Sequence, residues 1–227
     1  MNVIEATHLV KTYNPDTIPV KAVNDISVEI KEGEFTAVVG PSGSGKTTLL
    51  NMIGGLDTPT EGSVIVNGVE IDMLSQSELT DFRMNNIGFV FQSYNLIPVM
   101  TAKENIEFIM LLQKSDKSLR DSRANELMEK MGISETSKRR PSELSGGQQQ
   151  RVAVARALAS KPKFILADEP TANLDSQSTE SLLDIMAKMN EEENVTFIFS
   201  THDQRVIDKA KRVITIVDGK IESDETR

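Results

Sequence analysis

Several features are missing from this 227-residue sequence. It contains no cysteine, which excludes disulfide bonds and thiolate metal ligands. No apolar run approaches the roughly 18 residues that cross a bilayer. The N-terminus also lacks the basic segment and apolar stretch of a secretory signal. We therefore expect a soluble chain that stays in the compartment where it is made.

A basic surface is missing as well. The formal net charge is −9, from 34 acidic and 25 basic residues. Non-specific binding to nucleic acid depends on Lys and Arg side chains that neutralise phosphates. The one basic cluster, Lys138–Arg140, is short and predicts a solvated loop. We expect no nucleic-acid partner.

No repeat, low-complexity tract or long Pro/Gly-rich linker divides the chain, which predicts a single domain over residues 1–227. Four short apolar runs are mostly continuous rather than alternating. This pattern is typical of strands buried on both faces of a parallel sheet. The runs are Phe35–Val39, Ile87–Phe91, Phe164–Ala167 and Val195–Phe199.

The N-terminal part has a different pattern. Ile26, Val28 and Ile30 alternate with polar residues, as in a half-exposed antiparallel strand. Ser63–Val66 is followed by Asn67-Gly68, which predicts a strand and a tight hairpin turn. We therefore predict an α/β fold with a mixed, mainly parallel sheet and an N-terminal antiparallel β part.

A helical subdomain is expected within residues 76–160, inserted into the α/β core. Two capping boxes, Ser75–Glu78 and Thr101–Glu104, predict where helices begin. After the second box, Ile106 and Met110 lie on one helical face and predict an amphipathic helix.

Residues 40–47 match the phosphate-loop pattern G-x-x-x-x-G-K-S/T in full. The loop follows the strand Phe35–Val39 and precedes a helix-forming run, Thr47–Ile53. Its glycines let backbone N–H groups point inward at an anion, and the helix N-terminus adds its dipole. Lys46 provides a charge for the β- and γ-phosphates, and the Thr47 hydroxyl is a predicted Mg²⁺ ligand. We expect ATP to contact Gly40, Pro41, Ser42, Gly43, Ser44, Gly45, Lys46, Thr47 and Thr48.

Two acids, Asp168 and Glu169, end the apolar strand that begins at Phe164. In open α/β sheets, ligands bind beyond the carboxyl ends of the strands. We predict that Asp168 holds Mg²⁺ through water and that Glu169 polarises the attacking water. Alone, such a pair more often caps a helix or lies in a solvated turn. The phosphate loop in the same chain favours the catalytic interpretation.

Two further strand ends carry polar side chains. Ile87–Phe91 ends at Gln92, whose amide can reach both a metal and a water, and Val195–Phe199 leads to His202. Four buried strands thus deliver polar groups to one sheet edge. On its own, His202 would more often be a structural histidine, and it is the convergence of strand ends that favours a place in the site. We predict an ATP-hydrolysing site whose catalytic residues are Lys46, Gln92, Glu169 and His202, with Thr47, Gln92 and Asp168 as metal ligands.

A second anion site is predicted at Leu144–Gln148, directly before an alanine-rich helix, Gln149–Ala159. A serine and two glycines at a helix start leave N–H groups free for an anion. The simpler alternative is an ordinary N-cap. Because this half-site has no lysine, it makes sense if it closes over a nucleotide held by another copy. The expected contacts are Ser145, Gly146, Gly147 and Gln148.

The order of these motifs resembles the ATPase subunits of ABC transporters over essentially the whole chain. The stretch Leu-Ser-Gly-Gly-Gln at 144–148 is highly specific to that superfamily. The resemblance implies two copies that sandwich two MgATP molecules, and integral-membrane permease subunits as partners. It also implies a place at the cytoplasmic face of the inner membrane, reached through the permease.

The resemblance also implies roles for individual residues. Tyr13 would stack on adenine, and Gln92 would sense the γ-phosphate and link to the membrane partner. Asp175 would couple the two nucleotide sites, and His202 would act as the switch histidine.

Two stretches, Ile87–Pro98 and Gly146–Arg156, resemble the lipoprotein-releasing and macrolide-export branch, peptide-antibiotic exporters and a cell-division relative. Ala172 departs from the glycine that is common in this branch. We expect an export or lipoprotein-release function, with a regulatory ATPase that moves no cargo as the alternative. A soluble ATPase acting on DNA or ribosomes would require a coiled coil, a second motif set or a basic surface. A small-molecule kinase is disfavoured by the half-site.

The residues that follow Gln92 are candidates for the docking groove of the permease. Tyr94, Leu96 and Ile97 form this apolar group. Burial under the helical subdomain is an equally good interpretation of the same residues.

Overall fold

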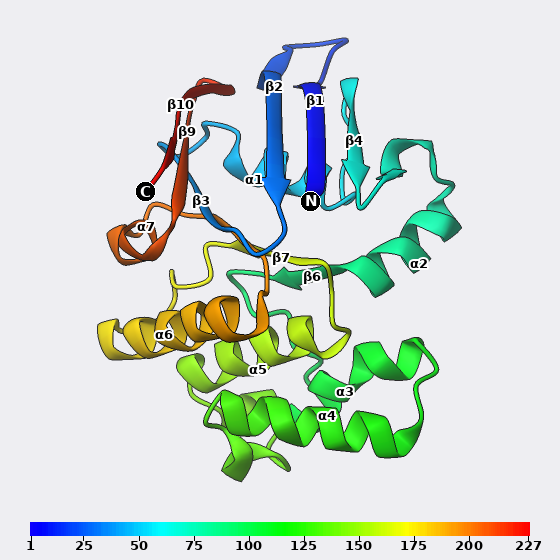
Figure 1. Ribbon diagram of the computed structural model, residues 1–227, viewed down its shortest axis with the longest axis vertical. Helices are drawn as coiled ribbons and strands as arrows, with labels where there is room; N and C mark the ends of the chain where they lie inside the picture. Colours follow the sequence, from blue (N-terminus) through cyan, green and yellow to red (C-terminus); the bar gives the residue numbers. More distant parts are fainter.

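The computed structural model describes residues 1–227, which form two β-sheets and a group of helices (Figure 1). The strands are β1 Asn2–Tyr13, β2 Val20–Lys31, β3 Phe35–Val39, β4 Glu61–Val66, β5 Val69–Glu70, β6 Ile87–Val90, β7 Phe164–Asp168, β8 Phe197–Ser200, β9 Arg212–Val217 and β10 Lys220–Thr226. The α-helices are α1 Lys46–Ile53, α2 Gln76–Asn86, α3 Ala102–Leu112, α4 Lys117–Lys130, α5 Gly146–Ala159, α6 Ser176–Glu193 and α7 Gln204–Lys209. Short 3₁₀-helices cover Ile71–Met73, Ser134–Thr136 and Pro141–Glu143.

The central sheet has the strand order β10-β9-β3-β8-β7-β6. All of its pairings are parallel except that between β9 and β10. In β3, Phe35 and Ala37 belong to one hydrophobic cluster and Val38 to another. Both faces of the sheet are therefore covered, which is why its strands are continuous apolar runs. The predicted mixed, mainly parallel sheet is confirmed.

The second sheet is antiparallel, with the order β2-β1-β4-β5. Ile26, Val28 and Ile30 of β2 are buried and their neighbours are exposed, as the alternating pattern predicts. Leu49 and Met52 of α1 pack with these residues in the smaller cluster. That cluster also includes residues of the central sheet, so α1 lies between the two sheets (Figure 1).

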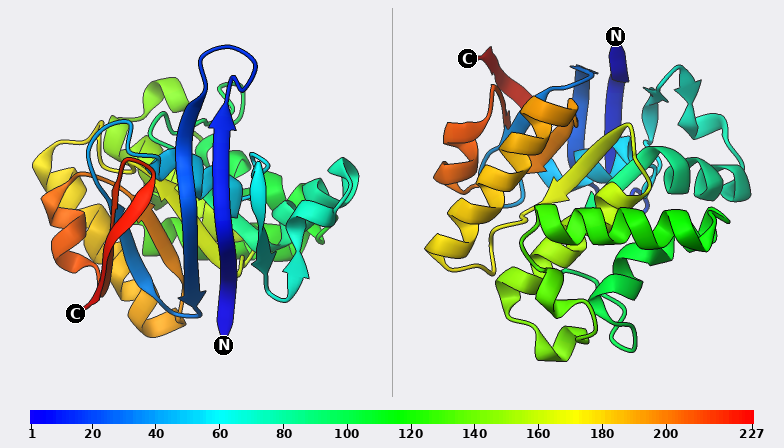
Figure 2. Two further views of the ribbon diagram at one scale, coloured as in Figure 1. Left: turned by 90° about the horizontal axis from the view of Figure 1, so that it is seen from above. Right: turned by 60° about the horizontal axis from the view of Figure 1, so that its bottom comes forward.

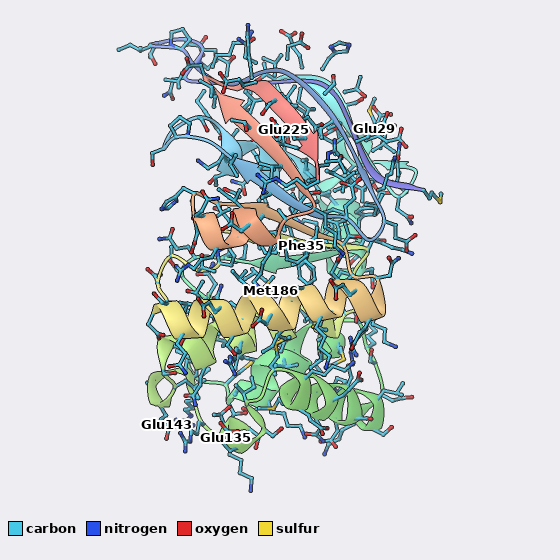
Figure 3. The ribbon with its side chains drawn as sticks, turned by 60° about the vertical axis from the view of Figure 1, so that its left-hand side comes forward. Glu29, Phe35, Glu135, Glu143, Met186 and Glu225 are labelled. Atoms are coloured by element: carbon cyan, nitrogen blue, oxygen red, sulfur yellow. The ribbon has the colours of Figure 1, made fainter.

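The helices α3, α4, α5 and α6 pack on the opposite face of the central sheet. In the right-hand view of Figure 2, the green helices gather at the bottom of the molecule and the blue strands at the top. Both Phe35 of β3 and Met186 of α6 belong to the larger cluster and lie in the layer between sheet and helices (Figure 3). Leu79 of α2, in contrast, belongs to the smaller cluster, so α2 packs with the α/β core.

The two expected capping boxes form at the starts of α2 and α3. In each, the hydroxyl of the N-cap residue, Ser75 or Thr101, accepts a bond from the backbone of a glutamate three residues later. No helix combines the length and the apolar character that a membrane crossing requires.

Candidate active site

The predicted site lies at the carboxyl edge of the central sheet, where β3, β8 and β7 end side by side. Ser200 of β8 pairs with Val38 on one side and with Asp168 on the other. The N–H of Thr201 donates to the carbonyl of Val38 at 3.1 Å, and the N–H of Glu169 donates to the carbonyl of Ser200 at 2.8 Å. These bonds fix the starting points of three loops relative to one another.

Glycines shape the loop between β3 and α1. Gly40 has a φ of 148° and Gly45 a φ of 104°. A Cβ atom would lie 2.0 Å from the carbonyl oxygen of Ile216 in the first case and 2.2 Å from that of Ala22 in the second. No larger residue fits either position. The helix α1 then begins without any side chain that caps its N-terminal N–H groups.

The Lys46 side chain folds back over the loop between β3 and α1. Its Nζ atom donates to the carbonyl oxygens of Gly40 and Pro41, both at 2.9 Å. The side chain is largely buried. Since an ammonium group has three protons, one donor direction remains for an anion. The loop thus presents unpaired backbone donors and one held positive charge.

Thr47 and Asp168 meet across the edge. The Thr47 hydroxyl donates to the Asp168 carboxylate, with oxygen–oxygen distances of 3.1 and 3.2 Å. Hard oxygen donors of this kind suit Mg²⁺, which commonly takes one or two protein ligands together with substrate phosphates and water. No cluster of three or more His, Cys, Asp or Glu side chains forms a complete metal cage. The pair therefore fits a magnesium ion that arrives with a nucleotide.

Glu169 adopts a left-handed backbone conformation, with φ of 46°. Such a conformation costs about 1 kcal/mol or more for a residue other than glycine. It directs the carboxylate toward His202, whose Nδ1 lies 2.8 Å from Oε1 of Glu169. The histidine side chain is 75% exposed and that of the glutamate only 17%. The Glu169 carboxylate, which the fold holds in place, is thus paired with the solvent-exposed imidazole of His202.

Gln92 lies on the loop after β6 with an exposed side chain. Its carbonyl oxygen accepts a 2.9 Å bond from Nδ2 of Asn173, a residue that sequence reasoning missed. Arg156 was also missed. Its guanidinium donates to the carbonyls of Tyr94 and Asn95 at 2.9 and 2.6 Å, and burial lowers its pKa. The one sequence signal for the role of Arg156 was an arginine within an alanine-rich helix, on the face that the structure buries.

The half-site before α5 lies among other neighbours. Ser145 caps α5 and forms a capping box with Gln148. A Cβ atom on Gly146 would lie 2.9 Å from the Tyr94 hydroxyl, and one on Gly147 would lie 2.9 Å from Oγ of Ser178. None of these neighbours belongs to the phosphate loop. Each of the two predicted anion sites therefore has its own surroundings within one chain.

Comparison with known proteins decides the family. The sequence profile of the ABC transporter family matches residues 23–172, about two thirds of the chain. The chain belongs to the ABC transporter family. It is an ABC-type ATPase, and the predicted family, fold class and ATPase activity are confirmed.

Relatives of this ABC ATPase include transport proteins and a solved dimer. The macrolide export protein MacB of Mannheimia succiniciproducens is 45% identical over 99% of the chain, which covers 35% of MacB. The lipoprotein-releasing ATP-binding protein LolD 1 of Rhodopseudomonas palustris is 42% identical, covering 97% of the chain and 98% of LolD 1. A dimeric structure of MJ0796 of Methanocaldococcus jannaschii, bound to ADP and Pi, has 42% identity and a TM-score of 0.91, covering 98% of each chain.

An apolar groove lies beside the Gln92 loop of the ABC ATPase. Its volume is about 350 Å³. Ile97 lines it, whereas Leu96 packs against the larger hydrophobic cluster and Tyr94 is half-buried. The main lining residues are Ile87, Phe89, Phe91, Ile97, Phe108, Ile109 and Arg156.

Tyr13 and Asp175 lie at two further positions of the ABC ATPase. Tyr13 ends β1 and its side chain is 37% exposed. Asp175 caps α6, where its carboxylate accepts bonds from the N–H and hydroxyl of Ser178. Ser178 in turn lies beside Gly147, so Asp175 is connected to the half-site through one serine.

Proposed function

We propose that two copies of this ABC ATPase bind two ATP molecules head to tail and hydrolyse them to drive a membrane partner. The observation that carries the proposal is the separation of the two anion sites. Lys46, Thr47, Asp168 and Glu169 gather at one sheet edge, whereas Ser145–Gly147 contact other residues. A second copy can place its half-site over the first copy's nucleotide. The dimeric MJ0796 structure with ADP and Pi supports this arrangement as a relative.

In the proposed complex, the phosphate loop binds the triphosphate. The N–H groups at the start of α1 contact the β- and γ-phosphates, and the third proton of Lys46 reaches their oxygens. Ser145, Gly146 and Gly147 of the second copy contact the γ-phosphate from the opposite side. Gln148 contributes indirectly, because its side chain accepts from the N–H of Ser145 and orders the turn.

Thr47, Asp168 and Gln92 are the residues that would hold Mg²⁺. When bound, the ion supplies positive charge that neutralises the phosphate oxygens. The Thr47 hydroxyl donates to Asp168 at 3.1 Å, so the two side-chain oxygens lie close enough to contact one ion. Asp175 would position the half-site of its own copy through Ser178, and this half-site closes over the nucleotide of the second copy.

The chemical step is an in-line displacement at the γ-phosphorus. Glu169 accepts a proton from water while the water oxygen bonds to phosphorus, and the bond from phosphorus to the bridging oxygen of ADP breaks. Charge that develops on the phosphoryl oxygens is stabilised by the loop N–H groups, Lys46 and His202. Because Glu169 is held by its backbone and by His202, little reorganisation is needed during the step.

Glu169→Gln tests this assignment, because the amide keeps the size of the side chain and removes the base. A positioned base contributes about 10²–10⁴ in rate. We expect turnover to fall by that factor, ATP affinity to stay near the parent value and a dimer to accumulate with ATP in size-exclusion chromatography. Glu225→Gln, at the exposed edge strand β10 (Figure 3), is the matched control. Parent-like turnover in Glu169→Gln would remove Glu169 from its role.

The groove beside the Gln92 loop is the surface where we propose that an integral-membrane permease docks on the cytoplasmic side. Its apolar lining and its position next to Gln92 support this role. Changing Ile97 and Phe108 together to Ser should abolish permease-stimulated hydrolysis and leave the basal rate intact. The exposed Leu111 and Leu112, changed in the same way, are the control. Stimulation that survives in the groove variant would reject the site.

Cargo movement of the export or lipoprotein-release type is the proposed outcome, supported by the similarity to MacB and LolD 1. A regulatory ATPase of a membrane complex would use the same nucleotide site. Affinity purification of the membrane partner separates the two. A partner that binds lipoprotein or a hydrophobic drug supports transport, and one that only activates another enzyme supports regulation.

A further inference from the structure

Tyr13 is held from two directions at the end of β1. Its hydroxyl donates to Oδ2 of Asp57 at 2.7 Å. Lys11 lies two residues earlier and therefore on the same side of the strand. The Lys11 ammonium lies over the tyrosine ring, 5.1 Å from its centroid, and donates to Oδ1 of Asp57 at 2.5 Å. The Asp57 carboxylate thus binds both the Tyr13 hydroxyl and the Lys11 ammonium, which covers one face of the tyrosine ring.

Asp57 is itself fixed to α1, the helix that begins in the phosphate loop. The N–H groups of Leu56 and Asp57 donate to the carbonyl of Asn51 at 2.8 and 3.2 Å. The Lys11 ammonium also reaches the carbonyl of Thr58 at 2.7 Å. Because Asn51 belongs to α1, this loop connects the tyrosine to the helix that begins in the phosphate loop.

The charges in this group are mutually satisfied. Burial acts to raise the pKa of Asp57, but hydrogen bonds from Lys11 and Tyr13 outweigh it and hold that pKa below its usual value. Burial and the hydrogen bond to Asp57 raise the pKa of the Tyr13 phenol. The carboxylate is therefore ionised and the phenol neutral at physiological pH, which is the protonation pattern that this arrangement requires.

We propose that Asp57 and Lys11 are positioning residues for base recognition, which hold the Tyr13 ring so that its open face receives a purine base. This inference rests on the proposed role of Tyr13 as the platform for the adenine of ATP. A ring already fixed loses little conformational freedom when a base stacks on it. With the cation on one face, a single face remains for stacking, and the Asp57 loop connects this ring to the helix that begins in the phosphate loop.

The first test compares the affinity for ATP with that for a ligand lacking a base. Loss of one stacked base typically weakens binding at least about fivefold. We expect Asp57→Ala to raise KM for ATP roughly five- to tenfold while kcat stays within about twofold. The inhibition constant of inorganic tripolyphosphate should not change. Equal weakening of ATP and tripolyphosphate would show damage to the phosphate loop and overturn the proposal.

Three further variants sharpen this test. Asp57→Asn keeps an acceptor for the phenol and should recover part of the loss. In a Tyr13→Phe background, which lacks the hydroxyl, Asp57→Ala should have a smaller effect than in the parent. Asp16→Ala removes an exposed acid from the neighbouring β1–β2 loop and should leave KM unchanged. An undiminished Asp57→Ala effect in Tyr13→Phe would show that Asp57 does not act through the phenol.

Tyr13→Ala separates this inference from the proposed function. If Tyr13→Ala leaves KM for ATP unchanged, the adenine platform itself is wrong. If Tyr13→Ala raises KM and Asp57→Ala does not, the platform stands and the positioning role is overturned. Melting temperatures of all variants, measured in the same buffer, identify any variant that fails to fold, and Asp57→Asn then replaces Asp57→Ala.

A spectroscopic signature is available because the chain has only two tyrosines and no tryptophan. Protein labelled at the tyrosine ζ-carbon gives two NMR signals, and loss of one in Tyr94→Phe assigns the other to Tyr13. We expect Asp57→Ala to shift the Tyr13 signal and lower the pKa at which it titrates, and ATP to shift it in the parent. An unmoved Tyr13 signal in Asp57→Ala would contradict the proposal.

Discussion

The N-termini of α1 and α5 are both helix starts rich in glycine, but they differ in what satisfies their N–H groups. At α1, Gly45 precedes the helix and no side chain caps it. At α5, Ser145 accepts from the N–H of Gln148 and the Gln148 side chain accepts from that of Ser145. Lys46 adds a charge to the first terminus, and no lysine accompanies the second.

This difference is the physical basis for proposing that only the α1 terminus forms a complete anion site. The donors of α1 have no partner in the chain and are therefore available to phosphate. The donors of α5 are partly satisfied by the capping box, so an anion gains less there. The α5 terminus is thus suited to complete a site that another copy has already formed.

Among variants that compare the two termini, the largest effect is expected from Lys46→Ala, which removes the charge that distinguishes α1 from α5. It also removes the bonds to Gly40 and Pro41 that close the loop. We expect kcat/KM for ATP to fall by about 10²–10³ or more, as for loss of a transition-state donor. Lys163→Ala, an exposed lysine, should hydrolyse ATP as fast as the parent. Hydrolysis at the parent rate in Lys46→Ala would show that this lysine does not distinguish the α1 terminus from the α5 terminus.

A smaller effect is expected from Ser145→Glu, which places a carboxylate at the exposed start of α5. Repulsion of the γ-phosphate should lower turnover at least about tenfold. ATP binding by the isolated chain at low protein concentration should not change, because α1 alone binds it. Ser145→Thr keeps the cap and should stay near the parent rate. Weaker ATP binding by monomeric Ser145→Glu would show that the α1 and α5 termini of a single chain act on the same nucleotide.

The smallest effect is expected at the N-terminus of α7, where the capping residue stabilises the fold. The Asp203 carboxylate accepts bonds from Arg205 and Thr171, and these hold its pKa below the usual value. A lowered pKa means that the carboxylate stabilises the fold above the unfolded-state pKa, near 4, and stops doing so as the pH falls through the folded value.

Asp203→Asn keeps a capping group and removes the charge. We expect the free energy of unfolding, measured with urea, to fall by about 0.5–1 kcal/mol at pH 7. The difference from the parent should shrink as the pH falls below about 4. A difference that is the same at both pH values would show that the charge is irrelevant at this terminus.

Local patterns predicted most of the fold and one anion site. The glycine spacing of the phosphate loop requires left-handed backbone at fixed positions, and Gly40 and Gly45 adopt it. Capping boxes predicted the starts of α2 and α3 because their bonds span three residues. Strand ends were less certain: β6 stops at Val90, one residue before the predicted end, and β8 begins two residues after the predicted start.

Contacts between distant residues were beyond prediction. Lys11 meets Asp57 across 46 positions, and Arg156 meets Tyr94 across 62, without any local signature. Tyr94 and Asn95 have left-handed backbone conformations, which end any regular alternation of buried and exposed side chains after Gln92. The sequence therefore left open that Leu96 turns inward while Ile97 lines the groove.

Mixing two impaired variants tests most directly whether a second copy completes the site. In a dimer of Glu169→Gln with Ser145→Glu, one nucleotide site combines the intact Glu169 of one copy with the intact Ser145 of the other. A single-turnover experiment with labelled ATP should yield a burst of ADP from the mixture that neither variant gives alone. ADP formation no greater than the sum of the separate variants would contradict the two-copy site.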